Sequence, residues 1–160
     1  VHNQGSMPGM NMLVDIGNGT MSILEIHDGR PIENSISTEV FGVHQCMEKI
    51  QKEVSKHSGV DVSEMLIEPL LRNGIGDRTD AVAMTTKRVA ENYTVEIMKK
   101  LTAHGYREEL VHLFIIGGGG CLLKNFSDLT AKSEVTVITD ICANAKGYEA
   151  LAMMKQRMRG

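Results

Sequence analysis

The residues Asp15, Gly17, Asn18, Gly19 and Thr20 have the types and spacing best suited to chemistry in this sequence. They stand between two short apolar runs, which places them on the turn between two predicted strands. Glycine lets the backbone come within hydrogen-bond reach of an anion, because no Cβ stands in the way. A carboxylate at a strand end can hold a divalent cation through water. The stretch therefore suits the phosphates and metal of a nucleotide, and the alternative is an ordinary hairpin with a tight Asn-Gly turn.

A second glycine cluster follows the apolar stretch 110–116 and consists of Gly117, Gly118, Gly119 and Gly120. Such an apolar run is typical of a strand buried on both faces of a parallel sheet. A helix predicted to follow it would offer its N-terminus to a phosphate or a flat ligand. The alternative is a close-packed turn whose glycines only let two elements approach. Both clusters lie at the carboxyl ends of predicted strands, where open α/β sheets bind ligands, so we expect one cleft to hold both.

The elements that position these residues follow from the apolar periodicity. Alternation predicts strands over 12–14, 20–26 and 32–41, with a hairpin turn at Asp28-Gly29. Spacings of three and four predict helices over 43–56 and 79–104, ended by Gly59 and Gly105. A shorter helix over 61–72 contains Pro69, which predicts a kink or break near Glu68. Strands are further predicted over 110–116 and 135–138, and helices over 121–129 and 143–159. This order predicts an α/β fold with a mixed five-stranded sheet, an antiparallel meander plus parallel strands, flanked by helices.

Composition limits the class of protein. The 160 residues suit one domain, and 42% apolar and 23% charged residues are ordinary for a globular protein. A net charge of −3 gives no support for direct binding to nucleic acid or to a membrane surface. The cysteines Cys46, Cys121 and Cys142 are widely spaced and predict reduced thiols in a cytoplasmic protein. No segment approaches the roughly 18 continuous apolar residues of a membrane span.

The motifs, taken in order, resemble a known family. An Asp-x-Gly-x-x-Thr hairpin over 14–20, a long helical stretch, and an apolar strand ending in glycines over 114–120 are similar to the second half of the actin-like ATPase fold, which is ribonuclease H-like. The segment 138–148, with its Ala-x-Ala-x-Gly-Tyr pattern, adds to the likeness. Actin, MreB and the seventy-kilodalton heat-shock chaperones share this fold, and the pattern most resembles the ParM/StbA group of plasmid-segregation proteins. The resemblance covers the chain from about Met12 to its end.

The resemblance implies ATP or ADP with Mg²⁺ as cofactors. Asp15 would position the metal through water. The amides and hydroxyl of the next residues would face the phosphates, which assigns a phosphate loop to Gly17, Asn18, Gly19 and Thr20. The second cluster would border the nucleoside, which assigns that side of the site to Gly117, Gly118 and Gly119, with Gly120 beside them.

The resemblance also implies a domain layout. Residues 12–160 would form the nucleotide-binding domain, and 43–77 would include a helical subdomain covering one side of the cleft. Arg72, Lys87 and Arg88 are candidates for contact with the ribose or base, although each is more simply a solvated helix charge. Residues 1–11 are polar and unpatterned and resemble a tag or linker.

The family builds its site from two domains, and only the second is recognisable here. Phosphoryl transfer depends on positioning and charge neutralisation, so we expect little ATPase activity from this chain and an active ATPase in the parent protein. The implied partners are further subunits in a filament, the missing N-terminal domain, and a DNA-binding adaptor of the ParR type.

Three alternatives stay open. The first is a nucleotide-binding scaffold of the FtsA or PilM type, which works through protein contacts. The second is half of a phosphotransferase resembling sugar or acetate kinases, which would need a substrate pocket with a catalytic Asp. The third is an α/β interaction module whose glycines only pack.

Overall fold

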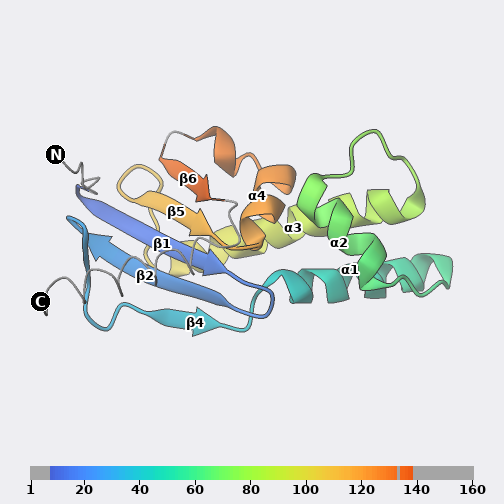
Figure 1. The fold of residues 1–160 in the computed structure, drawn as a ribbon, viewed down its shortest axis with the longest axis horizontal. Helices are drawn as coiled ribbons and strands as arrows, with labels where there is room; N and C mark the ends of the chain where they lie inside the picture. Colours follow the sequence, from blue (N-terminus) through green and yellow to red (C-terminus); the bar gives the residue numbers. More distant parts are fainter. Residues whose placement is uncertain (1–7, 133, 139–160) are drawn as a thin grey trace, which may run out of the picture.

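A single mixed β-sheet organises the computed structural model, which describes residues 8–132 and 134–138 (Figure 1). Its strands are β1 (Met10–Ile16), β2 (Met21–His27), β3 (Arg30–Pro31), β4 (Ser37–Glu39), β5 (His112–Ile116) and β6 (Val135–Ile138). The order is β3-β2-β1-β5-β6, and β4 also pairs with β2. The β1–β2 pair is antiparallel, whereas β5 is parallel to both β1 and β6. The predicted combination of a meander with parallel strands is confirmed.

The sheet has six strands rather than five, because β3 (30–31) lies before the third predicted strand, 32–41, and only β4 (37–39) forms within that predicted strand. Asn34 interrupts it with a left-handed backbone at φ 61°. The Ser35 hydroxyl donates to Ile32 O (2.8 Å) and accepts from Glu25 N (3.2 Å), so a side chain takes the place of a strand-to-strand bond. The Asp28-Gly29 hairpin turn is confirmed, with positive φ at both residues (49° and 74°).

Four α-helices and one short 3-10 turn complete the described chain: α1 (Val43–Ser58), α2 (Glu64–Asn73), α3 (Ala81–Ala103), α4 (Gly119–Phe126) and η1 (Leu129–Ala131). Both predicted glycine stops are confirmed. Gly59 is left-handed (φ 67°) and its amide donates to Ser55 O. Gly105 (φ 94°) and Tyr106 bond back to α3 in the Schellman pattern, the latter to Leu101 O at 2.9 Å.

Of the kink or break predicted near Glu68, the break is not found: α2 runs through Pro69 to Asn73. Proline has no amide hydrogen, so the helix lacks the bond that residue 69 would make to Met65 O. Burial on one side compensates: Ile67, Leu70 and Leu71 are all at most 4% exposed. The helix is therefore retained by tertiary packing rather than by its own backbone.

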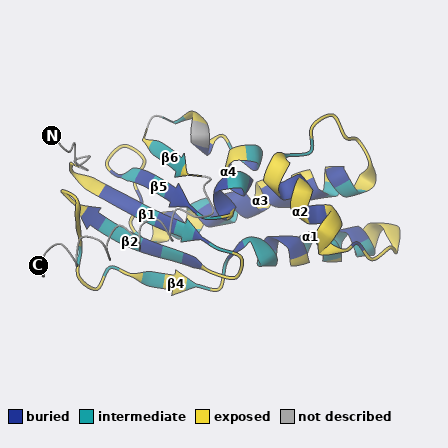
Figure 2. Ribbon diagram, viewed as in Figure 1, coloured by how far each residue is buried: buried dark blue, intermediate teal, exposed yellow. Residues whose placement is uncertain are grey.

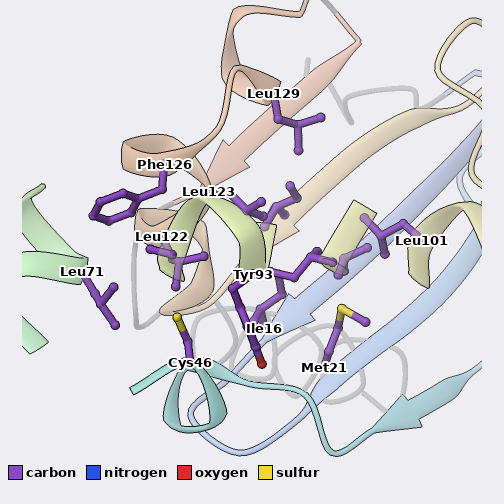
Figure 3. Close-up of a cluster of buried hydrophobic side chains, with 14 of the residues drawn as sticks. Ile16, Met21, Cys46, Leu71, Tyr93, Leu101, Leu122, Leu123, Phe126 and Leu129 are labelled. Carbon is purple, nitrogen blue, oxygen red and sulfur yellow. The ribbon is translucent and has the colours of Figure 1, made fainter. Parts of the chain in front are cut away.

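The core lies between the sheet and the helices on one of its faces. Alternate residues of β1, Met12, Val14 and Ile16, are buried on this face. Tyr93 and Leu101 of α3 pack there, as do the side chains of α4 (Figures 2 and 3). The carboxyl ends of β1 and β5 point toward α1 and α2, which extend beyond the strands (Figure 1).

Some predictions fall outside the described residues, namely the helix over 143–159 and the tag or linker over residues 1–7. Residues 10 and 11 belong to β1, which starts two residues earlier than predicted. Within residues 8–132 and 134–138, no helix is both long and apolar enough to cross a bilayer.

Candidate functional site

The loop between β1 and β2 is closed by a hydrogen bond from Gly17 N to Thr20 O (2.9 Å). Its carbonyls face α1: Gly17 O accepts from Val43 N (3.0 Å), and Asn18 O accepts from His44 N (2.8 Å). In the described part of the chain, the Asn18 and Gly19 amides donate to no protein group. The carbonyls are thus held toward the helix, while these two exposed amides stay available to an anion.

Gly42 lets α1 start directly against this loop. A Cβ at Gly42 would lie 2.4 Å from Asn18 O, a distance that no side chain tolerates. The buried Tyr93 hydroxyl donates to Gly42 O at 2.8 Å, and its ring stacks on Phe41 with centroids 4.4 Å apart. Figure 3 shows the Tyr93 hydroxyl directed away from α4 and toward the segment that precedes α1. The loop is therefore fixed to both α1 and α3.

The second glycine cluster packs against the end of β1. Gly117 has a left-handed backbone (φ 85°), and a Cβ there would lie 2.6 Å from Ile16 O and 2.7 Å from Asp15 Oδ1. A Cβ at Gly119 would lie 2.2 Å from Ile16 Cγ2. Gly119 and Gly120 form the first turn of α4. The packing interpretation thus accounts for Gly117 and Gly119, and the two clusters meet in space.

A cavity of about 600 Å³ opens where the clusters meet. Four parts of the chain contribute its lining residues: Gly17 and Asn18 of the loop, Val43 and Met47 of α1, Glu64, Glu68, Leu71 and Arg72 of α2, and the N-cap Gly118 with Cys121 and Leu122 of α4. Pockets for small ligands typically hold about 300–1,000 Å³ and combine apolar walls with a few polar groups. The cavity meets both conditions.

Charged groups lie on one wall of this cavity. Arg72 pairs with Glu68 (2.7 Å), and His44 Nδ1 lies 3.3 Å from Glu64. Asp15 lies at the carboxyl end of β1, half-buried beside Gly117. In residues 8–132 and 134–138 there is no cluster of three or more His, Cys, Asp or Glu side chains suited to holding a metal by itself.

The two described cysteines have different surroundings. Burial raises the pKa of the Cys46 thiol to about 12, so this group stays protonated and unreactive. Cys121 is half-buried and lines the cavity. Cys121 is therefore the described cysteine that a reagent entering the cavity can reach.

Of the cationic candidates, only Arg72 reaches the cavity. Arg88 pairs with Glu53 (2.9 Å), and Lys87 lies 4.0 Å from Glu91. Sequence reasoning missed the carboxylates Glu64 and Glu68, although their spacing with Arg72, four residues apart, marks one face of a helix. It also missed Gly42, whose position directly before a predicted helix was the available signal.

Solved structures of actin-like proteins match this fold. Ta0583, an archaeal actin homologue crystallised with ADP, is 20% identical with a TM-score of 0.71, and the match covers 95% of this chain and 53% of that one. ParM of Bacillus thuringiensis with ATP is 16% identical (TM-score 0.63, 88% and 44% covered). The apo psk41 ParM protein is 17% identical (TM-score 0.69, 98% and 45% covered). The chain thus spans about half the length of these proteins.

These likenesses define the class: the chain has the mixed-sheet α/β fold of actin-like ATPases. A family model adds the assignment from sequence. Residues 13–128 match the family described as archaeal actin homologue MreB-like, C-terminal, and the chain belongs to that family. A search of curated protein sequences finds no match.

Proposed function

We propose that this chain binds ATP or ADP in the 600 Å³ cavity. The observation that carries the proposal is the meeting of both glycine clusters at one cavity, with Gly17 and Asn18 on one side and Gly118 on the other. Neighbouring structures were solved with ADP and with ATP, which supports a nucleotide as the ligand.

Residues of different chemistry contact different parts of the nucleotide. The free amides of Asn18 and Gly19, together with the Thr20 hydroxyl, bind phosphate oxygens. The apolar side chains at the cavity wall receive the nucleoside, and Gly118 lets it approach the backbone. Glu68 and Arg72 supply polar contacts on the α2 side. In domain terms, residues 43–77 form the helical subdomain that covers this side of the nucleotide.

The residues present also fit Mg²⁺ bound through the nucleotide. Mg²⁺ usually keeps several waters and is held by one or two carboxylates together with substrate phosphates. A single carboxylate, Asp15, at the mouth of the phosphate loop matches that mode, with contact through water. When bound, the ion would neutralise phosphate charge.

On our proposal, hydrolysis requires catalytic groups from a further domain. The chain spans about half of its structural neighbours, and phosphoryl transfer needs groups placed on both sides of the phosphates. The isolated chain therefore binds nucleotide with little turnover, and the parent protein, with its N-terminal domain, is the ATPase.

At the cellular level we propose a filament-forming protein of the ParM/StbA type that moves plasmid DNA. Its subunits contact one another, and a DNA-binding adaptor of the ParR type links the filament to DNA. The ParM structures among the neighbours support this assignment. Sedimentation of the parent protein with and without ATP tests it: nucleotide-dependent pelleting is expected, and identical pelleting under both conditions would exclude it.

Gly118 provides the test of the nucleotide site. A Cβ at Gly118 would meet only Val43 Cγ2, at 3.9 Å, so Gly118→Ala is sterically tolerated. Gly118→Leu extends a side chain into the cavity. In a fluorescence titration with a labelled ATP, Gly118→Ala should bind more weakly than wild type and Gly118→Leu should lose binding, while both variants remain folded. Equal binding by all three would place the nucleotide elsewhere.

A further inference from the structure

Helix α2 forms one wall of the cavity, yet its own backbone stabilises it poorly. Pro69 removes one internal hydrogen bond. The C-terminal end of α2 also differs from the C-terminal ends of the other described helices. Backbone amides cap α1 (Gly59 N to Ser55 O, 2.8 Å), α3 and α4, but within the described residues no backbone amide caps the last turn of α2. Its final carbonyls need partners from elsewhere.

Asn125 of α4 supplies these partners. Its Nδ2 donates to Leu71 O at 3.1 Å and to Arg72 O at 2.9 Å, two carbonyls in the last turn of α2. A Cβ at Gly74, where α2 ends, would lie 3.7 Å from Asn125 Cγ, so the side chain lies against that end of the helix. One amide group thus replaces the missing backbone cap.

The two helices joined in this way are two walls of the cavity. Asn125 caps Leu71 and Arg72, and both of these residues line the cavity from α2. Cys121 lines the cavity from α4. Asn125 follows Cys121 by four residues, which places both on the same side of α4. Leu71 also enters the core from α2 beside Leu122 of α4 (Figure 3). Asn125 therefore links the two walls through its hydrogen bonds to α2.

We propose that Asn125 is a positioning residue that holds α2 at the distance from α4 that the nucleotide requires. This inference rests on the proposed nucleotide site. Asn125 touches no ligand in this account; it acts through Leu71 and Arg72. Loss of the amide donor frees the end of α2 and weakens nucleotide binding, while the sheet and α3 keep their structure.

Asn125→Asp tests the inference, because it keeps the shape and replaces the donor with an oxygen that repels both carbonyls. Asn92→Asp is the matched control: Asn92 is exposed on α3, and the charge change is the same. We expect labelled ATP to bind Asn125→Asp about tenfold more weakly and the control like wild type. Asn125→Gln, which keeps the amide, should recover part of the affinity. If Asn125→Asp does not fold, Asn125→Ala takes its place.

Hydrogen exchange of the same variants without nucleotide separates the two proposals. Faster exchange confined to α2, residues 64–73, is expected in Asn125→Asp. Unchanged exchange in α2, or unchanged affinity in a chain that binds nucleotide, would overturn the role of Asn125. If the wild type binds no nucleotide, the proposed function fails, and the exchange of α2 still decides whether Asn125 holds that helix.

Discussion

Replacing Gly117, Gly118 and Gly119 by alanine, one at a time, separates packing from ligand binding in the second glycine cluster. At Gly117 the left-handed backbone (φ 85°) costs alanine about 1–2 kcal/mol. The new Cβ would also lie 2.6 Å from Ile16 O, and such overpacking costs about 1–3 kcal/mol. Gly117→Ala should therefore lose about 2–5 kcal/mol out of a total stability of about 5–15 kcal/mol.

The neighbouring positions give graded expectations. Gly119 has an ordinary helical backbone, but its Cβ would lie 2.2 Å from Ile16 Cγ2, so alanine should cost about 1–3 kcal/mol. The nearest atom to a Cβ at Gly118 is 3.9 Å away, so alanine there should change stability by no more than about 0.5 kcal/mol.

Urea unfolding followed by circular dichroism measures all three variants. The slope with urea should match wild type, so that changes in midpoint report stability. A loss at Gly118 as large as that at Gly117 would refute the reasoning, because the cavity-lining glycine would then be needed for packing. A Gly117→Ala protein as stable as wild type would refute the close contacts between Gly117 and β1.

Two further predictions concern the Tyr93 hydroxyl and the Glu39 carboxylate, which each join α3 to another part of the chain. Burial raises the pKa of Tyr93, so its hydroxyl remains a donor. Tyr93→Phe keeps the stacked ring but leaves Gly42 O unpaired, which should lower the free energy of unfolding in urea by about 1–3 kcal/mol. An unchanged free energy of unfolding would contradict the role of this hydrogen bond. Hydrogen bonds from Lys100, and to a smaller extent from His104, lower the pKa of Glu39 in the folded protein. The ionised Glu39 carboxylate therefore stabilises the fold fully above the unfolded-state pKa of about 4, and this stabilisation is lost as the pH falls through the lower folded pKa. The stability difference between wild type and Glu39→Gln should therefore be largest near neutral pH and shrink in acid, and a constant difference would contradict the ion pair.

The sequence predicted the sheet and most helices because the determining signals are local. Apolar alternation marks β1 and β2, and Gly59 and Gly105 end their helices through a left-handed backbone that does not depend on the rest of the fold. The interruption at Asn34 was missed because it depends on the Ser35 side chain bonding to β2. The continuity of α2 at Pro69 was missed because burial outweighs a local penalty.

The candidate site was predictable in part for the same reason. The two glycine clusters are visible in sequence, and their shared strand-end position predicts that they meet. Which glycine faces a ligand is a matter of tertiary contact: Gly117 and Gly119 abut Ile16, whereas Gly118 faces the cavity. The cap from Asn125 to α2 spans more than 50 residues of sequence, and no local pattern announces it.

Protection of Cys121 by nucleotide tests most directly whether the cavity is the nucleotide site. In a Cys142→Ser chain, Cys121 is the accessible thiol, because Cys46 is buried with its pKa raised to about 12. Alkylation by iodoacetamide, followed by intact-mass spectrometry, should add one group without nucleotide and proceed more slowly as ATP is added up to saturation. Buffer without nucleotide and a sugar phosphate that does not bind serve as controls. An alkylation rate that is unchanged at saturating ATP, in a chain shown by titration to bind it, would contradict the site.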